Sequence, residues 1–203
     1  MAGAKRKAKR AHRTTADLAA SKEASAVDEM PRVLVLSGPN LDRLGQREPH
    51  IYGSETLEEI HARLELVGKE LGVEVEGRQS NHEGTLIDWI GSAHEEGFSA
   101  ILINAGAYTH TSLALYDALK CSPLPAVEVH LSNPAAREEF RHVSRIAPAC
   151  VGTVAGFRGE SYTVALWAVI SAALSRLESS SKKSKKSATE RRSNELRDRR
   201  RSA

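Results

Sequence analysis

Apolar and polar residues follow two regular patterns through the middle of the chain. Residues 33–36 and 100–103 are continuous apolar runs, which are typical of strands buried on both faces of a sheet. Residues 73–76 alternate between apolar and acidic side chains, which predicts an edge strand. Two further strands are predicted at residues 126–131 and 151–155.

Helical periodicity fills the segments between these strands. Residues 56–71 carry an apolar stripe at helical intervals, and Thr56 and Glu59 have the spacing of a capping box. Further helices are predicted at residues 86–96, 111–119 and 161–177. Strand and helix alternate without two consecutive strands, which predicts an α/β fold with a five-stranded parallel sheet and helices on both faces.

The two ends of the chain differ in composition from its middle. The net charge of +3 is uneven, because residues 32–177 hold 12 basic and 18 acidic side chains. The ends lack apolar periodicity and cannot bury enough apolar area to offset the entropy of ordering them. We therefore expect a disordered basic N-terminal extension (1–31), one domain (32–177) and a disordered Lys/Arg/Ser-rich tail (178–203). Met30 is a second candidate start of translation.

Composition argues against several classes of protein. No apolar stretch follows the N-terminal basic cluster, and the longest apolar run, Tyr162 to Leu174, is shorter than the ~20 residues that span a bilayer. We therefore expect a cytoplasmic protein without a membrane partner. The acidic domain argues against nucleic acid as a partner, so that only the basic tails remain as an alternative functional segment. Cys121 and Cys150 have neither metal-ligand spacing nor the density of a disulfide framework, and we expect both to act as small apolar residues.

A long loop, residues 38–53, follows the first predicted strand and carries Asn40, Arg47 and Tyr52. Strand-to-helix connections in such folds usually take about two to six residues, so this length is typical of a lid or a binding loop. A solvated surface loop with a packed tyrosine is the alternative.

A second polar cluster, residues 104–112, joins a strand to a helix and contains Asn104, Gly106 and His110. Backbone N–H groups at a helix start suit an anionic or polar ligand. The hydroxyl residues of the cluster, Thr109, Thr111 and Ser112, are explained more simply as helix caps. Asn104 and His110 then have no explanation other than function.

Two arginines one helical turn apart, Arg137 and Arg141, follow the fourth predicted strand, which carries Glu128 and His130. Such a pair can hold a carboxylate through bidentate hydrogen bonds. The alternatives are that the arginines pair with the neighbouring acidic residues and that His130 is a core residue.

These three clusters follow strands of one parallel sheet, so we expect them to meet at its carboxyl edge. Together they place one Tyr, two His, two Asn and three Arg at that edge. This set suits an oxygen-rich anionic substrate that undergoes proton transfer. A ligand-binding or regulatory module with the same sheet is the alternative from another class, and it has no need to keep these side chains together.

The same segments resemble, in order, the sequence signatures of type II 3-dehydroquinate dehydratases. The first is Gly38-Pro39-Asn40-Leu41 with Arg47-Glu48-Pro49 and Tyr52-Gly53. The later ones are Gln79–Gly84, Asn104–Gly106 with Thr109–Ser112, Glu128–Asn133 and Arg137–Arg141. The match spans roughly residues 33–175. It implies a flavodoxin-like three-layer fold, no cofactor or metal, and a homododecamer assembled from four trimers.

The resemblance also implies a role for each matching residue. Tyr52 is expected to take the proton beside the ketone of 3-dehydroquinate, with Arg47 favouring the tyrosinate and Asn40 helping to stabilise the enolate. His130, oriented by Glu128, is expected to protonate the departing hydroxyl, which gives 3-dehydroshikimate. The expected substrate-binding residues are Asn104, Gly106, His110, Asp117, Leu131, Ser132, Arg137 and Arg141. Asp117 would reach the site of a neighbouring subunit. The reaction serves either aromatic biosynthesis through the shikimate pathway or quinate degradation.

The predicted domain contains two lysines, Lys69 and Lys120, and neither lies in a candidate loop, which fits a mechanism without a Schiff base. The chain departs from the family at Ala135 and Val143, where histidines are usual, and at Arg158, where a glycine is usual. These changes spare the expected acid and base. We expect them to alter the packing of the substrate-clamping loop and to reduce turnover.

Overall fold

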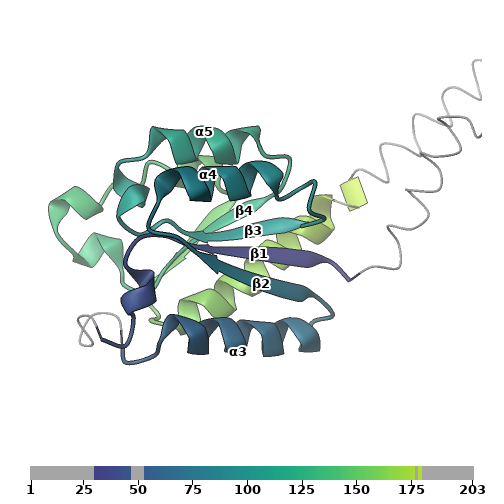
Figure 1. The fold of residues 1–203 in the computed structure, drawn as a ribbon, viewed down its shortest axis with the longest axis horizontal. Coiled ribbons are helices and arrows are strands. Elements are labelled where there is room, and N and C mark those ends of the chain that lie inside the picture. Colours follow the sequence, from purple (N-terminus) through teal and green to yellow (C-terminus); the bar gives the residue numbers. More distant parts are fainter. Residues whose placement is uncertain (1–29, 47–52, 177, 180–203) are drawn as a thin grey trace, which may run out of the picture. The chain divides into compact units, whose positions relative to one another are not determined.

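The computed structural model describes residues 30–46, 53–176 and 178–179. They form three layers, with a parallel five-stranded sheet between helices on its two faces (Figure 1). The strand order is β2-β1-β3-β4-β5, and every neighbouring pair is parallel. The predicted sheet and its helical cover are confirmed.

The elements follow the predicted order. The strands are β1 (Arg32–Ser37), β2 (Glu74–Gln79), β3 (Ala100–Asn104), β4 (Ala126–His130) and β5 (Gly152–Ala155). The helices are α3 (Leu57–Glu70), α4 (Glu83–Ser92), α5 (Leu113–Cys121) and a C-terminal helix over residues 160–176.

Two apolar cores lie on opposite faces of the sheet. One is formed by α3 and the C-terminal helix, which includes the fully buried Tyr162, and the other by α4 and α5 (Figure 1). Strands β3 and β4 are buried at every residue, as expected of central strands. Strand β2 lies at an edge and begins with an exposed residue, so the edge strand inferred from its alternation is confirmed.

Helix boundaries show where the apolar pattern misleads. The capping box of α3 is present, because the Thr56 side chain accepts from the Glu59 N–H and the Glu59 side chain accepts from the Thr56 N–H. Helix α4 starts three residues earlier than predicted, since its first turn is polar and carries no apolar signal. It also ends at Ser92 instead of residue 96, and the chain then turns back at Gly97, where φ is 87°.

The carboxyl ends of β1 and β3 are held close together. Ser37 pairs in register with Asn104, and the Gly38 N–H donates to the Asn104 carbonyl at 2.8 Å. A Cβ on Gly38 would lie 2.5 Å from the Ala105 carbonyl oxygen, so only glycine fits at this position. This close approach brings the segments after β1 and β3 to one place at the carboxyl edge.

Candidate active site

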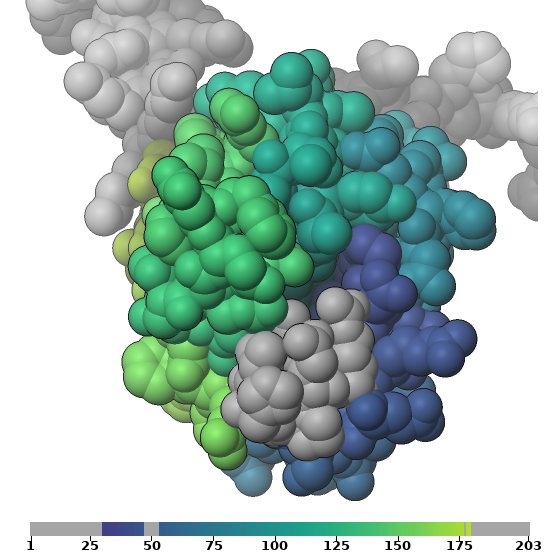
Figure 2. All heavy atoms as spheres, turned by 90° about the vertical axis from the view of Figure 1, so that its left-hand side faces the viewer, coloured from purple at the N-terminus to yellow at the C-terminus, as the bar shows by residue number. Residues whose placement is uncertain are grey.

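A cavity of about 150 Å³ opens at the carboxyl edge of the sheet. Figure 2 looks onto this face, where the segments that follow β1, β3 and β4 surround a hollow. Nine of the predicted site residues line the cavity, namely Asn40, Asn104, Gly106, His110, His130, Leu131, Ser132, Arg137 and Arg141. The expected gathering of the three clusters is therefore confirmed for these residues.

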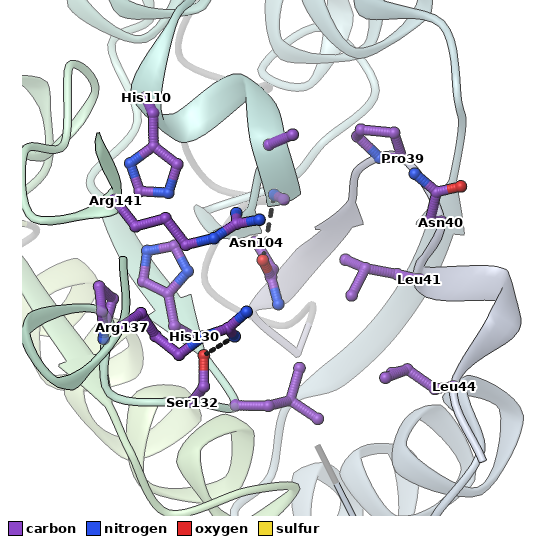
Figure 3. A pocket seen from close by; sticks show the side chains of 14 residues that line it. Pro39, Asn40, Leu41, Leu44, Asn104, His110, His130, Ser132, Arg137 and Arg141 are labelled. Carbon is purple, nitrogen blue, oxygen red and sulfur yellow. Dashed lines mark hydrogen bonds between the residues drawn. The ribbon is translucent and has the colours of Figure 1, made fainter. Parts of the chain in front are cut away.

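The cavity has a polar side and an apolar side. Figure 3 shows the two histidines and two arginines on one side, and Pro39, Leu41 and Leu44 on the other with Asn40. Sequence reasoning missed this apolar wall, because single Pro and Leu residues in a loop carry no chemical signal. A substrate with a charged end and a carbon skeleton would meet both kinds of surface.

His130 and Glu128 form a buried pair at the end of β4. The Nε2 atom of His130 lies 2.6 Å from Oε1 of Glu128, whose side chain has no exposed surface. Residues two apart on a strand project from the same face, which explains why these two side chains meet. Because the carboxylate can only accept, Nε2 carries the proton of this bond and Nδ1 is the ring nitrogen left for a ligand.

Asn104 is held by two hydrogen bonds. Its Oδ1 accepts from the Gly106 N–H at 3.1 Å, and its Nδ2 donates to the hydroxyl of Tyr162 at 3.0 Å. Burial raises the pKa of Tyr162 to about 12, so the hydroxyl is neutral and serves as an anchor. Nδ2 keeps a second proton for a ligand. Tyr162 was not predicted as a site residue, since it lies far along the chain within an apolar helix.

His110 is oriented through the backbone. Its Nδ1 lies 2.9 Å from the carbonyl oxygen of Val143, which can only accept, so Nδ1 carries the proton and Nε2 is left for a ligand. Of the three hydroxyl residues in this cluster, Ser112 caps α5 by accepting from the Leu115 N–H. The predicted helix start at Thr111 is displaced to Leu113, because residues 106–110 form the 3-10 helix η2 (Gly106–His110).

Arg137 and Arg141 share one carboxylate at the rim of the cavity. Their Nε atoms lie 3.2 Å and 3.1 Å from Oε2 of Glu138. A backbone hydrogen bond, and after it the two arginines, lower the pKa of that carboxyl. The alternative of pairing with a neighbouring acid is therefore observed for Glu138, and both arginines also line the cavity. They are not on an α-helix, because Arg137 follows the 3-10 helix η3 (Pro134–Ala136) and Arg141 ends η4 (Glu139–Arg141).

The turn that carries Asn40 is fixed from the neighbouring strand. Asn40 has φ 63°, a conformation that favours Gly and Asn, and its N–H donates to Oδ1 of Asn81 at 2.8 Å. The same Oδ1 accepts from Gln79, while the Asn81 carbonyl accepts from the hydroxyl of Tyr108. Asn81 thus joins the segments after β1, β2 and β3.

Comparison with known proteins agrees with this geometry. The family model for class II dehydroquinases matches residues 31–170. A 3-dehydroquinate dehydratase of Rhizobium johnstonii is 56% identical over 137 residues, which cover 68% of this chain and 94% of the relative. One from Thermus thermophilus is 58% identical over 134 residues, with 66% and 90% covered. The crystal structure of the type II dehydroquinase from Propionibacterium acnes has a TM-score of 0.66 at 44% identity and covers 70% of this chain and 98% of its own.

The chain belongs to the class II dehydroquinase family. This membership confirms the resemblance drawn from the motifs, the flavodoxin-like fold and the enzyme class, a hydro-lyase that works without a Schiff base. Neither Lys69 nor Lys120 is among the described residues that line the cavity.

Four of the predicted dehydroquinase residues are not among the described residues that line this cavity, and one of them, Glu128, is buried against His130. Asp117 is exposed on α5 and does not line the cavity of its own chain. Arg47 and Tyr52 lie outside the described residues. The described part of the site therefore contains the expected acid and most of the expected binding residues.

The departures from the dehydroquinase pattern have local explanations. Val143 is 59% exposed and contributes its carbonyl to His110, which any residue can do. At position 135 the contact is made by the backbone, because the N–H of Ala135 donates to Oδ1 of Asn133 at 3.1 Å. Arg158 has φ 53°, a left-handed conformation that costs a non-glycine residue free energy. Its N–H donates to the Leu131 carbonyl at 2.8 Å, so the turn next to the site is formed in spite of the substitution.

The cysteines are only partly as expected. Both thiols are free; Cys150 packs against the core of α4 and α5, whereas Cys121 is exposed at the end of α5. Burial and the charge of Glu128 raise the pKa of Cys150 to about 12, so that thiol is unreactive. In the part of the chain that the structure describes, no three His, Cys, Asp or Glu side chains are arranged to hold a metal ion. None of the described helices is long and apolar enough to cross a membrane.

Proposed function

We propose that this dehydroquinase eliminates water from 3-dehydroquinate in the cavity beside His130, giving 3-dehydroshikimate. The observation that carries the proposal is the buried pair of Glu128 and His130, at 2.6 Å, opening onto a cavity with two arginines and two asparagines. The substrate is a hydroxylated carboxylate with a ketone, and the polar side of the cavity offers donors for each of these groups.

The proposed reaction has two proton transfers. The phenolate of Tyr52, favoured by the charge of Arg47, takes a proton from the carbon beside the ketone, and the electron pair moves onto the ketone oxygen. Asn40 supports the resulting enolate through preorganised donors. When the enolate re-forms the ketone, the carbon–oxygen bond to the hydroxyl breaks. His130, protonated on both ring nitrogens, gives its Nδ1 proton to the departing hydroxyl, which leaves as water.

The remaining cavity residues are proposed to bind the substrate. Arg141 and Arg137 lie where a carboxylate would bind, and that carboxylate would share them with Glu138. The free Nδ2 proton of Asn104 and the Nε2 atom of His110 suit hydroxyl groups. The backbone N–H groups at Leu131 and Ser132, and the backbone at Gly106, are proposed to complete the site.

Assembly into a homododecamer of four trimers is part of the proposal. Asp117 is exposed on α5, so it can complete the site only of another subunit. Exposed apolar side chains such as Trp167 (57%) and Phe157 (63%) support burial against further copies of the chain. The cytoplasm is the proposed compartment, with residues 32–177 as the catalytic domain; the expected extensions lie largely outside the described residues. The other enzymes of the same metabolic route determine whether the reaction serves aromatic biosynthesis or quinate degradation.

Ultraviolet absorbance on mixing the protein with 3-dehydroquinate tests the function. The product is a conjugated enone and the substrate is not, so absorbance should rise with the wild type. Tyr52→Phe, which removes the base, should lower the rate by about a hundred-fold or more. A folded, oligomeric wild type that gives no signal would refute the dehydratase assignment and favour a binding module.

A further inference from the structure

The carboxylate of Glu128 is held by more than the imidazole it supports. Ser144 Oγ lies 2.9 Å from Oε1 and 3.0 Å from Oε2, while Thr153 Oγ1 lies 3.4 Å from Oε2. His130 reaches Oε1 alone. A fully buried carboxylate is costly unless its oxygens accept hydrogen bonds. Ser144 therefore provides the short contact to Oε2, the oxygen that His130 does not reach.

The direction of the Ser144 hydroxyl is fixed. Its Oγ accepts from the Ala147 N–H at 2.9 Å, at the start of the 3-10 helix η5 (Ala147–Ala149). A hydroxyl has a single proton, and an accepted N–H occupies one lone pair of the oxygen. The proton is therefore left to point at the Glu128 carboxylate, between its two oxygens.

We propose that Ser144 is a positioning residue for the general acid. By holding Glu128 it keeps Oε1 on the Nε2 proton of His130, which fixes the imidazole tautomer and leaves Nδ1 toward the cavity. Ser144 is not among the described residues that line the cavity, so we expect its effect on the reaction to pass through the pair of Glu128 and His130. The inference rests on the proposed function only where it calls His130 the acid, because the hydrogen bonds themselves are independent of the reaction.

The test is Ser144→Ala, examined by nitrogen-15 NMR of the histidine rings and by kinetics. The His130 signals are assigned from their loss in His130→Ala. At a pH where the ring is neutral, the wild type should show one tautomer, with the proton on Nε2. Ser144→Ala should populate both tautomers and lower kcat about ten-fold, with KM changed less than about two-fold, because substrate contacts are kept. Ser144→Thr keeps the hydroxyl and should restore the single tautomer.

Ser122→Ala is the matched control. The Ser122 hydroxyl also accepts a backbone N–H, from Leu124 at 3.2 Å, but it lies before β4 and makes no hydrogen bond to a carboxylate of the described residues. It should leave both the His130 tautomer and kcat at wild-type values. If Ser144→Ala does not fold, Ser144→Cys replaces the hydroxyl by a weaker donor and should give an intermediate loss.

The outcomes separate this inference from the proposed function. An unchanged tautomer with an unchanged kcat in a folded Ser144→Ala or Ser144→Cys overturns the positioning role. A wild type inactive on 3-dehydroquinate whose His130 tautomer still depends on Ser144 leaves the positioning of the imidazole standing and refutes the dehydratase function.

Discussion

His130 and His61 are both histidines set against the sheet, yet their surroundings differ completely. His130 ends β4, is 8% exposed and has the Glu128 carboxylate 2.6 Å from Nε2. His61 lies on α3 with its ring against Gly77 of β2, and its buried Nε2 has no hydrogen-bond partner among the described residues. Burial lowers the pKa of His61, although Glu58 and Glu65 oppose the shift.

The comparison shows that a histidine beside the sheet is suited to catalysis by the side chain that it contacts, here the carboxylate of Glu128. Burial lowers the pKa of His61, whose Nε2 has no hydrogen-bond partner among the described residues, whereas the carboxylate beside His130 accepts from Nε2 and fixes the orientation of its ring. The two histidines also differ in access, because His130 lines the cavity, whereas the half-buried His61 has its ring against Gly77 of the edge strand β2. A histidine in the sequence is therefore a candidate for catalysis only when a second residue is placed to orient it.

Removing the partner of His130 should have the largest effect. Glu128→Gln keeps the shape of the side chain but removes the carboxylate charge beside the ring that must carry the proton for the departing hydroxyl. We expect kcat to fall about a hundred-fold or more, with KM within about three-fold of wild type, measured by enone absorbance.

The control for this change is Glu76→Gln, the same substitution on the edge strand β2. Glu76 is ion-paired with Arg32 and Arg78, but its side chain is 37% exposed and lies away from the cavity. Exposed pairs contribute little, so kcat should not change. A Glu128→Gln enzyme with more than about a third of wild-type kcat would contradict the need for the carboxylate.

A smaller effect is expected from crowding His61. A Cβ at Gly77 would overlap the His61 ring, so Gly77→Ala forces the ring or α3 to move. We expect a loss of about 1–3 kcal/mol in the free energy of unfolding, measured by urea denaturation, with kcat per folded molecule unchanged.

Gly91→Ala provides the matched control, because a Cβ at Gly91 in α4 meets nothing within 4 Å. Alanine favours a helix over glycine, so this variant should be stabilised by up to about 1 kcal/mol. If Gly77→Ala and the wild type have the same free energy of unfolding, then the His61 ring or α3 moves away from β2 without loss of stability.

The sequence predicts most of the fold because its central strands are continuous apolar runs and the cap of α3 is a local pattern. It misplaces the start of α4, whose first residues are polar, and it treats Arg137 and Arg141 as an α-helical pair where the backbone is 3-10. The family resemblance correctly pairs Glu128 with His130, and the strand explains the contact, since alternate residues of a strand share a face.

The supporting residues of the site are beyond local reasoning. Ser144 lies 16 residues from Glu128, and Tyr162 lies 58 residues from Asn104. Asn81 belongs to a predicted motif, yet its bond to the Asn40 N–H depends on the turn geometry after β1. These contacts depend on how the loops pack, and no periodicity in the sequence reports that packing.

The smallest expected effect concerns pH and tests the state of His61 directly. Its pKa in the folded protein is lowered from 6.5 by burial, so below that pH the unfolded chain binds the proton more readily. The free energy of unfolding should therefore have its full value above about pH 7 and decline as the pH falls below about 6.5.

His61→Gln removes the titrating group and should flatten this decline, which urea denaturation between about pH 5 and pH 8 would measure. The difference between the two curves isolates His61, because every other group titrates in both proteins. A wild type and a His61→Gln variant with parallel curves would mean that the ring reaches water in the folded state. In that case exposure, and not the absent partner, would distinguish His61 from His130.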